Sequence, residues 1–182
     1  MSYFDWRTLD HVLRCGVESS QSDVLVVRQG RLVPALPPRS LRDARLFLDT
    51  GASLVVRRAE RRNNRLRELA ASFADEIPGA AQVQLFITPK GARGFGWHYD
   101  AEDVFILQTM GSKNYFFREN TVNPRPSPQP VYDFSAVRRE LTPIMTCTLL
   151  AGDWLYVPSG WWHVATAQED SLSISVGLLP RE

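Results

Sequence analysis

The 182-residue sequence contains few cysteines, the residues that crosslink small domains through disulfides. Its two cysteines, Cys15 and Cys147, lie far apart in the chain, so neither a disulfide framework nor a Cys-x-x-Cys metal site is expected. Both are predicted to be buried or half-buried free thiols in a reducing compartment. No apolar run approaches the ~20 residues of a membrane span, and the first residues lack the apolar core of a signal peptide. We therefore expect a soluble, cytoplasmic protein without a membrane partner.

An excess of one charge is also missing, because 21 Lys and Arg face 20 Asp and Glu. A protein that binds polyanions in general is usually more basic, so nucleic acid is not expected as a direct substrate. The exception is a run of six arginines within residues 57–67. It predicts either a solvated polar face or a contact surface for an acidic protein or RNA. Lysine is rare, with Lys90 and Lys113 only.

The first 80 residues predict helices alternating with short strands. Leu66, Leu69, Ala70 and Phe73 follow the 3.6-residue period of an amphipathic helix. Together with the breakers at Gln29-Gly30 and 36–40, these patterns predict a helix within 1–15, a strand–turn–strand unit at 23–33, a helix at 41–49 with Ser40 as its N-cap, a β-rich run at 53–58 and a helix at 59–75.

Beyond residue 80 the sequence consists of short β-rich segments divided by Gly, Pro, Asp and Ser. They are residues 82–88, 94–100, 103–111, 113–119, 144–153, 154–160, 161–167 and 171–179. Many short strands at this spacing are typical of a sandwich, jelly roll or barrel. The segment 121–131 carries four prolines and cannot pair as a central strand, so it is expected to be a plain insertion or part of a substrate-covering lid.

Two of the three histidines stand where they could bind a metal ion. His98 and Asp100 alternate along one predicted strand, so their side chains point to the same face. His163 follows the turn residues 158–160, which places it at the start of another strand. Two imidazoles and one carboxylate form a facial triad with three open positions, a set that suits non-haem Fe(II) and oxygen chemistry. His11 is expected to be a surface or packing residue.

Two stretches of the sequence resemble a known family. GFGWHYDAEDVFILQTMGSKNYFF and GDWLYVPSGWWHVATAQEDSLSISVGL are similar to the JmjC/cupin branch of the Fe(II)- and 2-oxoglutarate-dependent oxygenases, most of all to its ribosomal-oxygenase-like (cupin-4) group. The resemblance implies a mainly β fold with N-terminal helices, in which a double-stranded β-helix (a jelly roll) holds the metal in its open end. We therefore expect residues 1–80 to be a lead-in packed on the barrel and residues 81–182 to be the catalytic core, within a single structural domain.

The resemblance also assigns roles to residues. His98, Asp100 and His163 match the iron ligands of the family, and Lys113 matches the basic residue that pairs with the distal carboxylate of 2-oxoglutarate. A dianion in a half-buried pocket needs a cation and one or two hydroxyls. The candidate hydroxyls are those of Thr88, Tyr115, Ser173 and Ser175. Beside His163, Trp161 and Trp162 are interpreted as packing residues or as the lining of a substrate groove.

The activity implied by the resemblance is hydroxylation of an amino-acid side chain in a protein or peptide. Fe(II), 2-oxoglutarate and O2 are the implied cofactors and cosubstrates, and 2-oxoglutarate is oxidatively decarboxylated to succinate and CO2. Demethylation is the same chemistry followed by loss of formaldehyde. The alternatives are the same reaction on a small molecule or natural product, and a non-catalytic metal-binding cupin module with the arginine run as its partner surface. The sequence predicts no particular oligomeric state.

Overall fold

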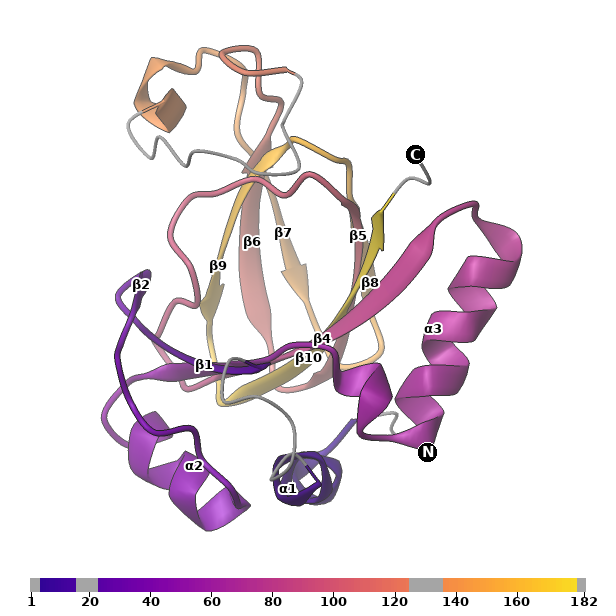
Figure 1. Cartoon of the computed structure of the whole chain (residues 1–182). Helices are drawn as coiled ribbons and strands as arrows, with labels where there is room; N and C mark the ends of the chain where they lie inside the picture. The colour runs from indigo at the N-terminus through magenta and orange to yellow at the C-terminus, as the bar shows by residue number, and fades with distance from the viewer. Residues whose placement is uncertain (1–3, 16–22, 125–135, 180–182) are drawn as a thin grey trace.

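The computed structural model describes residues 4–15, 23–124 and 136–179 (Figure 1). Its elements, in chain order, are α1 (Trp6–Arg14), β1 (Val24–Arg28), β2 (Arg31–Leu32), α2 (Leu41–Leu48), β3 (Ser53–Val56), η2 (Ala59–Arg61), α3 (Asn64–Glu76), β4 (Ala80–Thr88), β5 (Asp103–Met110), β6 (Lys113–Arg118), η3 (Ala136–Arg139), β7 (Met145–Leu149), β8 (Trp154–Val157), β9 (Trp162–Ala167) and β10 (Ser171–Leu179).

The strands form two antiparallel sheets. The larger sheet has the order β2-β1-β3-β4-β10-β5-β8 and the smaller has the order β7-β6-β9. Residues of both sheets line one pocket between them, so the sheets face each other across an interior, as in a jelly roll. The predicted fold, a double-stranded β-helix preceded by helices, is confirmed.

Strand β10 shows how the sequence directs one face to the core and the other to the pocket. Its apolar residues Leu172, Ile174 and Val176 are fully buried in the main core. The alternate residues Ser173 and Ser175 point to the opposite face and line the pocket. In this segment the serines therefore face the polar pocket, and the aliphatic residues between them face the apolar core.

The three α-helices cover the outer face of the larger sheet. Leu9 of α1, Leu48 of α2 and Leu66 of α3 join the same buried core as the β10 residues. The predicted N-cap Ser40 is confirmed, because its hydroxyl accepts the backbone N–H of Asp43 at 3.2 Å. One core thus runs across residue 80, while the division of the chain at that residue stays a prediction.

The predicted helix at 59–75 is two elements. Asn63 interrupts it, since its side chain accepts the backbone N–H groups of Arg65 and Leu66 and caps a new helix. Asparagine competes for backbone hydrogen bonds in this way and favours caps over helix interiors. The 3.6-residue pattern correctly predicted which side of α3 faces the core. It did not predict the break at Asn63.

The arginine run of residues 57–67 is only partly a solvated face. Arg58 and Arg62 form ion pairs with the carboxylate of Asp23, which is 3% exposed. The other four arginines of the run are exposed, namely Arg57, Arg61, Arg65 and Arg67. Two of the six charges therefore serve to bury a carboxylate beside β1.

Some predictions about individual residues change. The expected burial of Cys15 is wrong, because it is exposed at the end of α1, whereas Cys147 is half-buried on β7; both are free thiols. Of the proline segment 121–131, residues 125–131 lie outside the described residues. Within the described part of the chain, no helix combines the length and the apolar character needed to cross a bilayer.

Candidate metal and 2-oxoglutarate site

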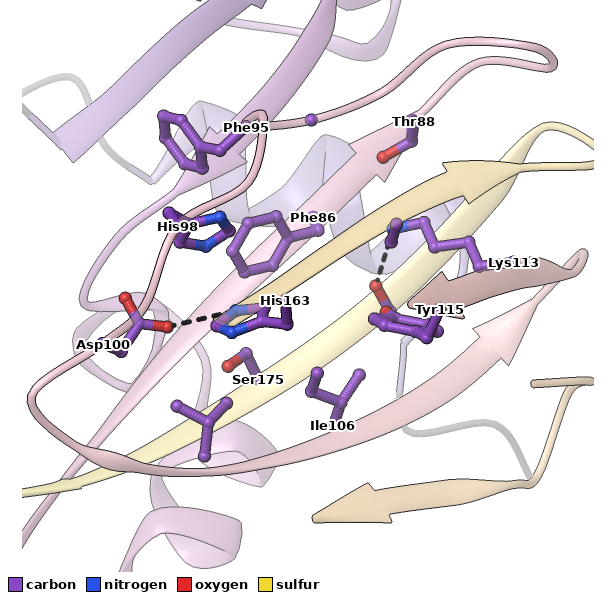
Figure 2. A pocket seen from close by; sticks show the side chains of 14 residues that line it. Phe86, Thr88, Phe95, His98, Asp100, Ile106, Lys113, Tyr115, His163 and Ser175 are labelled. Carbon is purple, nitrogen blue, oxygen red and sulfur yellow. Dashed lines mark hydrogen bonds and ion pairs between the residues drawn. The ribbon is translucent and has the colours of Figure 1, made fainter. Parts of the chain in front are cut away.

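A pocket between the two sheets collects the predicted site residues (Figure 2). It is lined from the larger sheet by Phe86, Thr88, Val104, Ile106, Ser173 and Ser175, from the smaller sheet by Lys113, Tyr115, His163 and Ala165, and from the segment before β5 by Gly94, Phe95, His98 and Asp100. All eight residues singled out from the sequence for metal or cosubstrate binding, Ser173 included, therefore face one cavity.

The segment 94–100 is not the regular strand that was predicted. A single isolated bridge connects this segment to β9, and it pairs His98 with His163. The two backbones exchange N–H···O bonds of 3.1 and 2.8 Å. Residues directly opposite each other in an antiparallel pair send their side chains to the same face. The two imidazole rings consequently lie side by side, with their centroids 4.2 Å apart.

Each imidazole is oriented by a backbone carbonyl two residues before it. Nδ1 of His98 lies 2.7 Å from the Gly96 oxygen, and Nδ1 of His163 lies 3.0 Å from the Trp161 oxygen. Because a carbonyl can only accept, Nδ1 carries the hydrogen in both rings. In the neutral ring Nε2 then keeps its lone pair, which is the arrangement found in metal-ligating histidines.

Asp100 completes a cluster of three ligand atoms that lie within 4.8 Å of one another. Its Oδ2 lies 3.4 Å from Nε2 of His163. Burial alone would raise the pKa of Asp100, but the hydrogen bond and charge of His163 outweigh it and lower the pKa to about 2. Burial and the neighbouring His163 lower the pKa of His98 to about 4. At neutral pH the Asp100 carboxylate is ionised and His98 is neutral, the forms that bind metals. The hydrogen bond and charge of Asp100 raise the pKa of His163 although burial lowers it, so the proton that Nε2 of His163 shares with Asp100 would be displaced when a metal binds.

The donor set fits a non-haem iron site. It offers two imidazole nitrogens and one carboxylate oxygen from two adjacent segments, without sulfur ligands. Such a set holds Fe(II) on one side and leaves further positions free for other ligands.

Lys113 is the second unusual feature of the pocket. The side chain is 3% exposed, and its ammonium group donates to the Ser173 hydroxyl at 3.0 Å. Burial alone lowers the pKa of Lys113 to about 7. Within the described residues no carboxylate lies close enough to form an ion pair with it. A buried cation without a counter-ion is unfavourable in the empty pocket and favourable once an anion enters.

Hydroxyl groups line the same pocket as this ammonium group. Thr88, Tyr115 and Ser173 are buried, and all of them line the pocket together with Ser175. Burial raises the pKa of the Tyr115 phenol, although a hydrogen bond with Ser173 acts in the opposite direction. Lys113 and Tyr115 face Ala167 and Ala165 across the β6–β9 ladder, so small side chains leave space beside the polar groups.

The turn between β1 and β2 contacts the segment that carries His98 and Asp100, and the sequence did not reveal this contact. Gly30 has a φ of +78° and forms a bridge with Phe95. A Cβ on Gly30 would lie 2.9 Å from the Gly96 nitrogen. Gly96 is the residue whose carbonyl orients His98, so the turn bears directly on one predicted ligand.

Gly30→Ala is therefore expected to weaken metal binding as well as stability. Gly51→Ala is the matched control, because Gly51 has a φ of +76° but nothing within 4 Å of an added Cβ. Both variants should lose roughly 1–2 kcal/mol of unfolding free energy from the left-handed backbone. Only Gly30→Ala should also lower Fe(II) affinity, by about tenfold as for other residues that orient a ligand. Urea unfolding and anaerobic Fe(II) titration measure the two effects; equal Fe(II) affinity in both variants would contradict this role of the turn.

A buried aromatic pair is formed by residues adjacent in sequence to the candidate metal ligands. Tyr99 lies between His98 and Asp100, and Trp162 precedes His163; both are almost fully buried, and their rings meet edge to face with centroids 4.8 Å apart. Asn123 donates to the Tyr99 hydroxyl at 3.1 Å. The packing interpretation of Trp162 is thus confirmed, and Trp161 is half-buried in the neighbouring apolar cluster.

Glu140 binds the start of the proline segment, close in sequence to Asn123. Its carboxylate is nearly inaccessible and accepts the backbone N–H and the hydroxyl of Thr121 at 2.6 and 2.7 Å, and the N–H of Val122 at 3.2 Å. Desolvation would raise the pKa of Glu140, but these hydrogen bonds lower it to about 2. The described start of the proline segment is therefore tied to Glu140, the residue that follows η3.

The fold and this pocket define a double-stranded β-helix protein with a candidate two-histidine, one-carboxylate metal centre. The chain belongs to the JmjC domain family, whose model matches residues 54–182. Within that family its similarity is to the ribosomal-oxygenase-like group, as the resemblance predicted.

Two curated relatives illustrate this similarity. The chain is 29% identical over 153 residues to the bifunctional lysine-specific demethylase and histidyl-hydroxylase NO66 of Dictyostelium discoideum, covering 81% of this chain and 27% of the relative. It is 28% identical over 134 residues to ribosomal oxygenase 1 of Gallus gallus, covering 71% and 22%. The chain therefore spans about a quarter of the length of these relatives.

Solved structures share the fold. The X-ray structure of YcfD from Escherichia coli matches all of this chain and 47% of its own, with a TM-score of 0.69 and 22% identity. A second YcfD structure, described as a ribosomal oxygenase in complex with cobalt and 2-oxoglutarate, matches with a TM-score of 0.64, 18% identity and coverage of 100% and 45%. At this level of identity the likeness concerns the architecture.

Proposed function

We propose that this chain is an Fe(II)- and 2-oxoglutarate-dependent oxygenase that hydroxylates an amino-acid side chain of a protein or peptide. Oxidative decarboxylation of 2-oxoglutarate to succinate and CO2 accompanies the reaction. The observation that carries the proposal is the meeting, in one pocket, of the His98–Asp100–His163 cluster with a buried Lys113 that has no carboxylate partner among the described residues. A metal-binding cupin without a dianionic cosubstrate has no need of the second feature.

Different residues of the pocket would bind the metal and the cosubstrate. His98, Asp100 and His163 would hold the metal, which when bound supplies oxygen activation coupled to 2-oxoglutarate decarboxylation. Lys113 with Ser173 would bind the distal carboxylate, and Thr88, Tyr115 and Ser175 offer further hydroxyls to the dianion. The apolar lining residues, such as Ile106, keep water from this part of the barrel.

The names of the relatives favour a protein substrate. NO66 is named a histidyl-hydroxylase and lysine-specific demethylase, and another relative is named a ribosomal oxygenase. Both named activities oxidise a C–H bond of a side chain, so we propose side-chain hydroxylation first and demethylation as a variation of it. A cytoplasmic location, inferred from the two unpaired cysteines, belongs to the same proposal.

Anaerobic titration with Fe(II) and 2-oxoglutarate tests the proposal. The pair should produce a visible charge-transfer absorption band that neither component produces alone with the protein. Admission of O2 should then convert 2-oxoglutarate to succinate, slowly without substrate and faster with a peptide pool that contains one. Absence of the band at saturating Fe(II) would contradict the proposal and favour the non-catalytic metal-binding module. Succinate formation that small metabolites stimulate and peptides do not would indicate a small-molecule substrate instead of a protein.

A further inference from the structure

A carboxylate stands at the rim of the pocket, beyond the candidate metal ligands. Along β10, Ser173 and Ser175 line the pocket, and Gly177 is the next residue on that face. A Cβ on Gly177 would collide with Oε2 of Glu102. Glu102 therefore lies over the inner face of the larger sheet, in space that the missing side chain of Gly177 provides.

The neighbouring strands make this part of the sheet polar. Gln84 is opposite Ser175, and Gln82 is opposite Gly177, so both amides share the face of the pocket. On the other side Val104, a lining residue, is opposite Gly177. We call Gln82, Gln84 and Glu102, all of which are half-buried, the polar rim.

Glu102 is the acid of its segment that has no partner. Asp100 contacts His163, and Asp103 accepts the Tyr156 hydroxyl at 2.8 Å and a backbone N–H at 3.0 Å. No described residue donates a hydrogen bond to Glu102 or forms an ion pair with it. Asp100 and Arg57 are near enough for their charges to act on it, with opposite signs.

We propose that Glu102 is a specificity-determining residue that binds a positively charged side chain flanking the residue to be oxidised. This rests on the proposed function. A half-buried carboxylate forms strong charge-assisted hydrogen bonds with guanidinium or ammonium groups and repels acidic ones. Glu102 lies on the rim and is absent from the residues that line the pocket, so the group it binds stays beside the pocket while a neighbouring side chain enters. The amides of Gln82 and Gln84 can bind the intervening main chain.

The binding step can be tested on the metal-free protein, so that its failure is separate from failure of the oxygenase proposal. The probes are the peptides acetyl-Gly-Gly-Xaa-Gly-Gly-amide with Xaa either arginine or citrulline, which have nearly the same shape and differ in charge. Chemical-shift titrations by NMR give the two dissociation constants. The arginine peptide should bind about fivefold more tightly, the effect of one half-exposed charge pair.

Three variants decide whether Glu102 is responsible. Glu102→Gln keeps the size of the side chain and should abolish the preference. Arg57→Gln removes an opposing positive charge and should increase affinity for the arginine peptide, so the proposal does not depend on a loss alone. Glu68→Gln, an exposed position on α3, should behave like the wild type. An unchanged preference in Glu102→Gln, or none in the wild type, would overturn the assignment.

The flanking position is tested with the loaded enzyme. Mass spectrometry after incubation with Fe(II), 2-oxoglutarate and O2 should find the probe arginine unmodified. Glu102-dependent addition of oxygen to that arginine would overturn the flanking position, because it would place the cation itself over the metal.

Discussion

Replacing Asp100 by alanine is expected to abolish tight Fe(II) binding while the fold persists. The variant removes one of three ligand atoms that lie within 4.8 Å of one another. Loss of a residue that merely orients a ligand lowers metal affinity by 10–100-fold, so loss of the ligand itself should lower it by at least about 100-fold. Anaerobic competition with a chromogenic chelator gives the dissociation constant, and succinate formation should disappear with it.

Asp49→Ala is the matched control, because it removes an exposed carboxylate at the end of α2. Circular dichroism should show the same β content in both variants and in the wild type. Asp100 lies in the segment 94–100, which pairs with β9 only through the isolated bridge between His98 and His163. Asp100 is not part of the apolar core clusters, so its loss leaves the apolar layers intact. Wild-type Fe(II) affinity in Asp100→Ala would exclude this cluster as the metal site.

The sequence predicted the fold well where one rule decides the structure. Of the predicted short β-rich segments, all except 94–100 became strands, namely β4 to β10. The serine–aliphatic alternation of residues 171–179 became a strand with one core face and one pocket face. Local rules failed where two of them competed. The helical pattern of residues 59–75 continues through Asn63, yet the capping hydrogen bonds of that side chain end one element and begin another.

The candidate ligands could be predicted because their chemistry is rare in this chain. The chain has three histidines. Two of them stand out, because His98 is followed two residues later by Asp100 and His163 follows a turn that ends in Gly160. What positions them could not be predicted, because it depends on contacts between distant segments. The contact of the Gly30 turn with Gly96 and the Tyr99–Trp162 pair each join residues more than 60 positions apart. A periodic pattern of residues along the sequence does not predict contacts of this kind.

The expected effect of replacing Lys113 by methionine has two opposite parts. Methionine fills a similar volume without a charge, so the protein should become more stable and lose 2-oxoglutarate binding. The ammonium group is buried, and its pKa falls from 10.5 in the unfolded chain to about 7 in the fold. Removing an uncompensated buried charge should raise the unfolding free energy at pH 7 by roughly 3 kcal/mol. Among the described residues that line the pocket, Lys113 is the only lysine or arginine, so its loss should weaken 2-oxoglutarate binding by at least about 100-fold.

The pH dependence follows from the same shift. Between pH 7 and about pH 10 the unfolded chain binds more protons at Lys113 than the fold does, so wild-type stability should gain from rising pH in this window. Lys113→Met should lack this contribution in urea unfolding at pH 7 and pH 10. The other lysine provides the control: Lys90 is exposed, and Lys90→Met should keep both the wild-type pH dependence and the affinity for 2-oxoglutarate.

Binding of the cosubstrate should reverse the loss of the proton. At pH 8 most of the Lys113 ammonium groups are deprotonated in the empty pocket, and an entering dianion favours the charged form again. Binding of 2-oxoglutarate to the Fe(II)-loaded protein should therefore take up about one proton at pH 8. Calorimetric titration in two buffers with different ionisation enthalpies measures this uptake, which should vanish in Lys113→Met. A wild-type protein that binds 2-oxoglutarate tightly with no proton uptake at pH 8 would show that Lys113 does not receive its carboxylate.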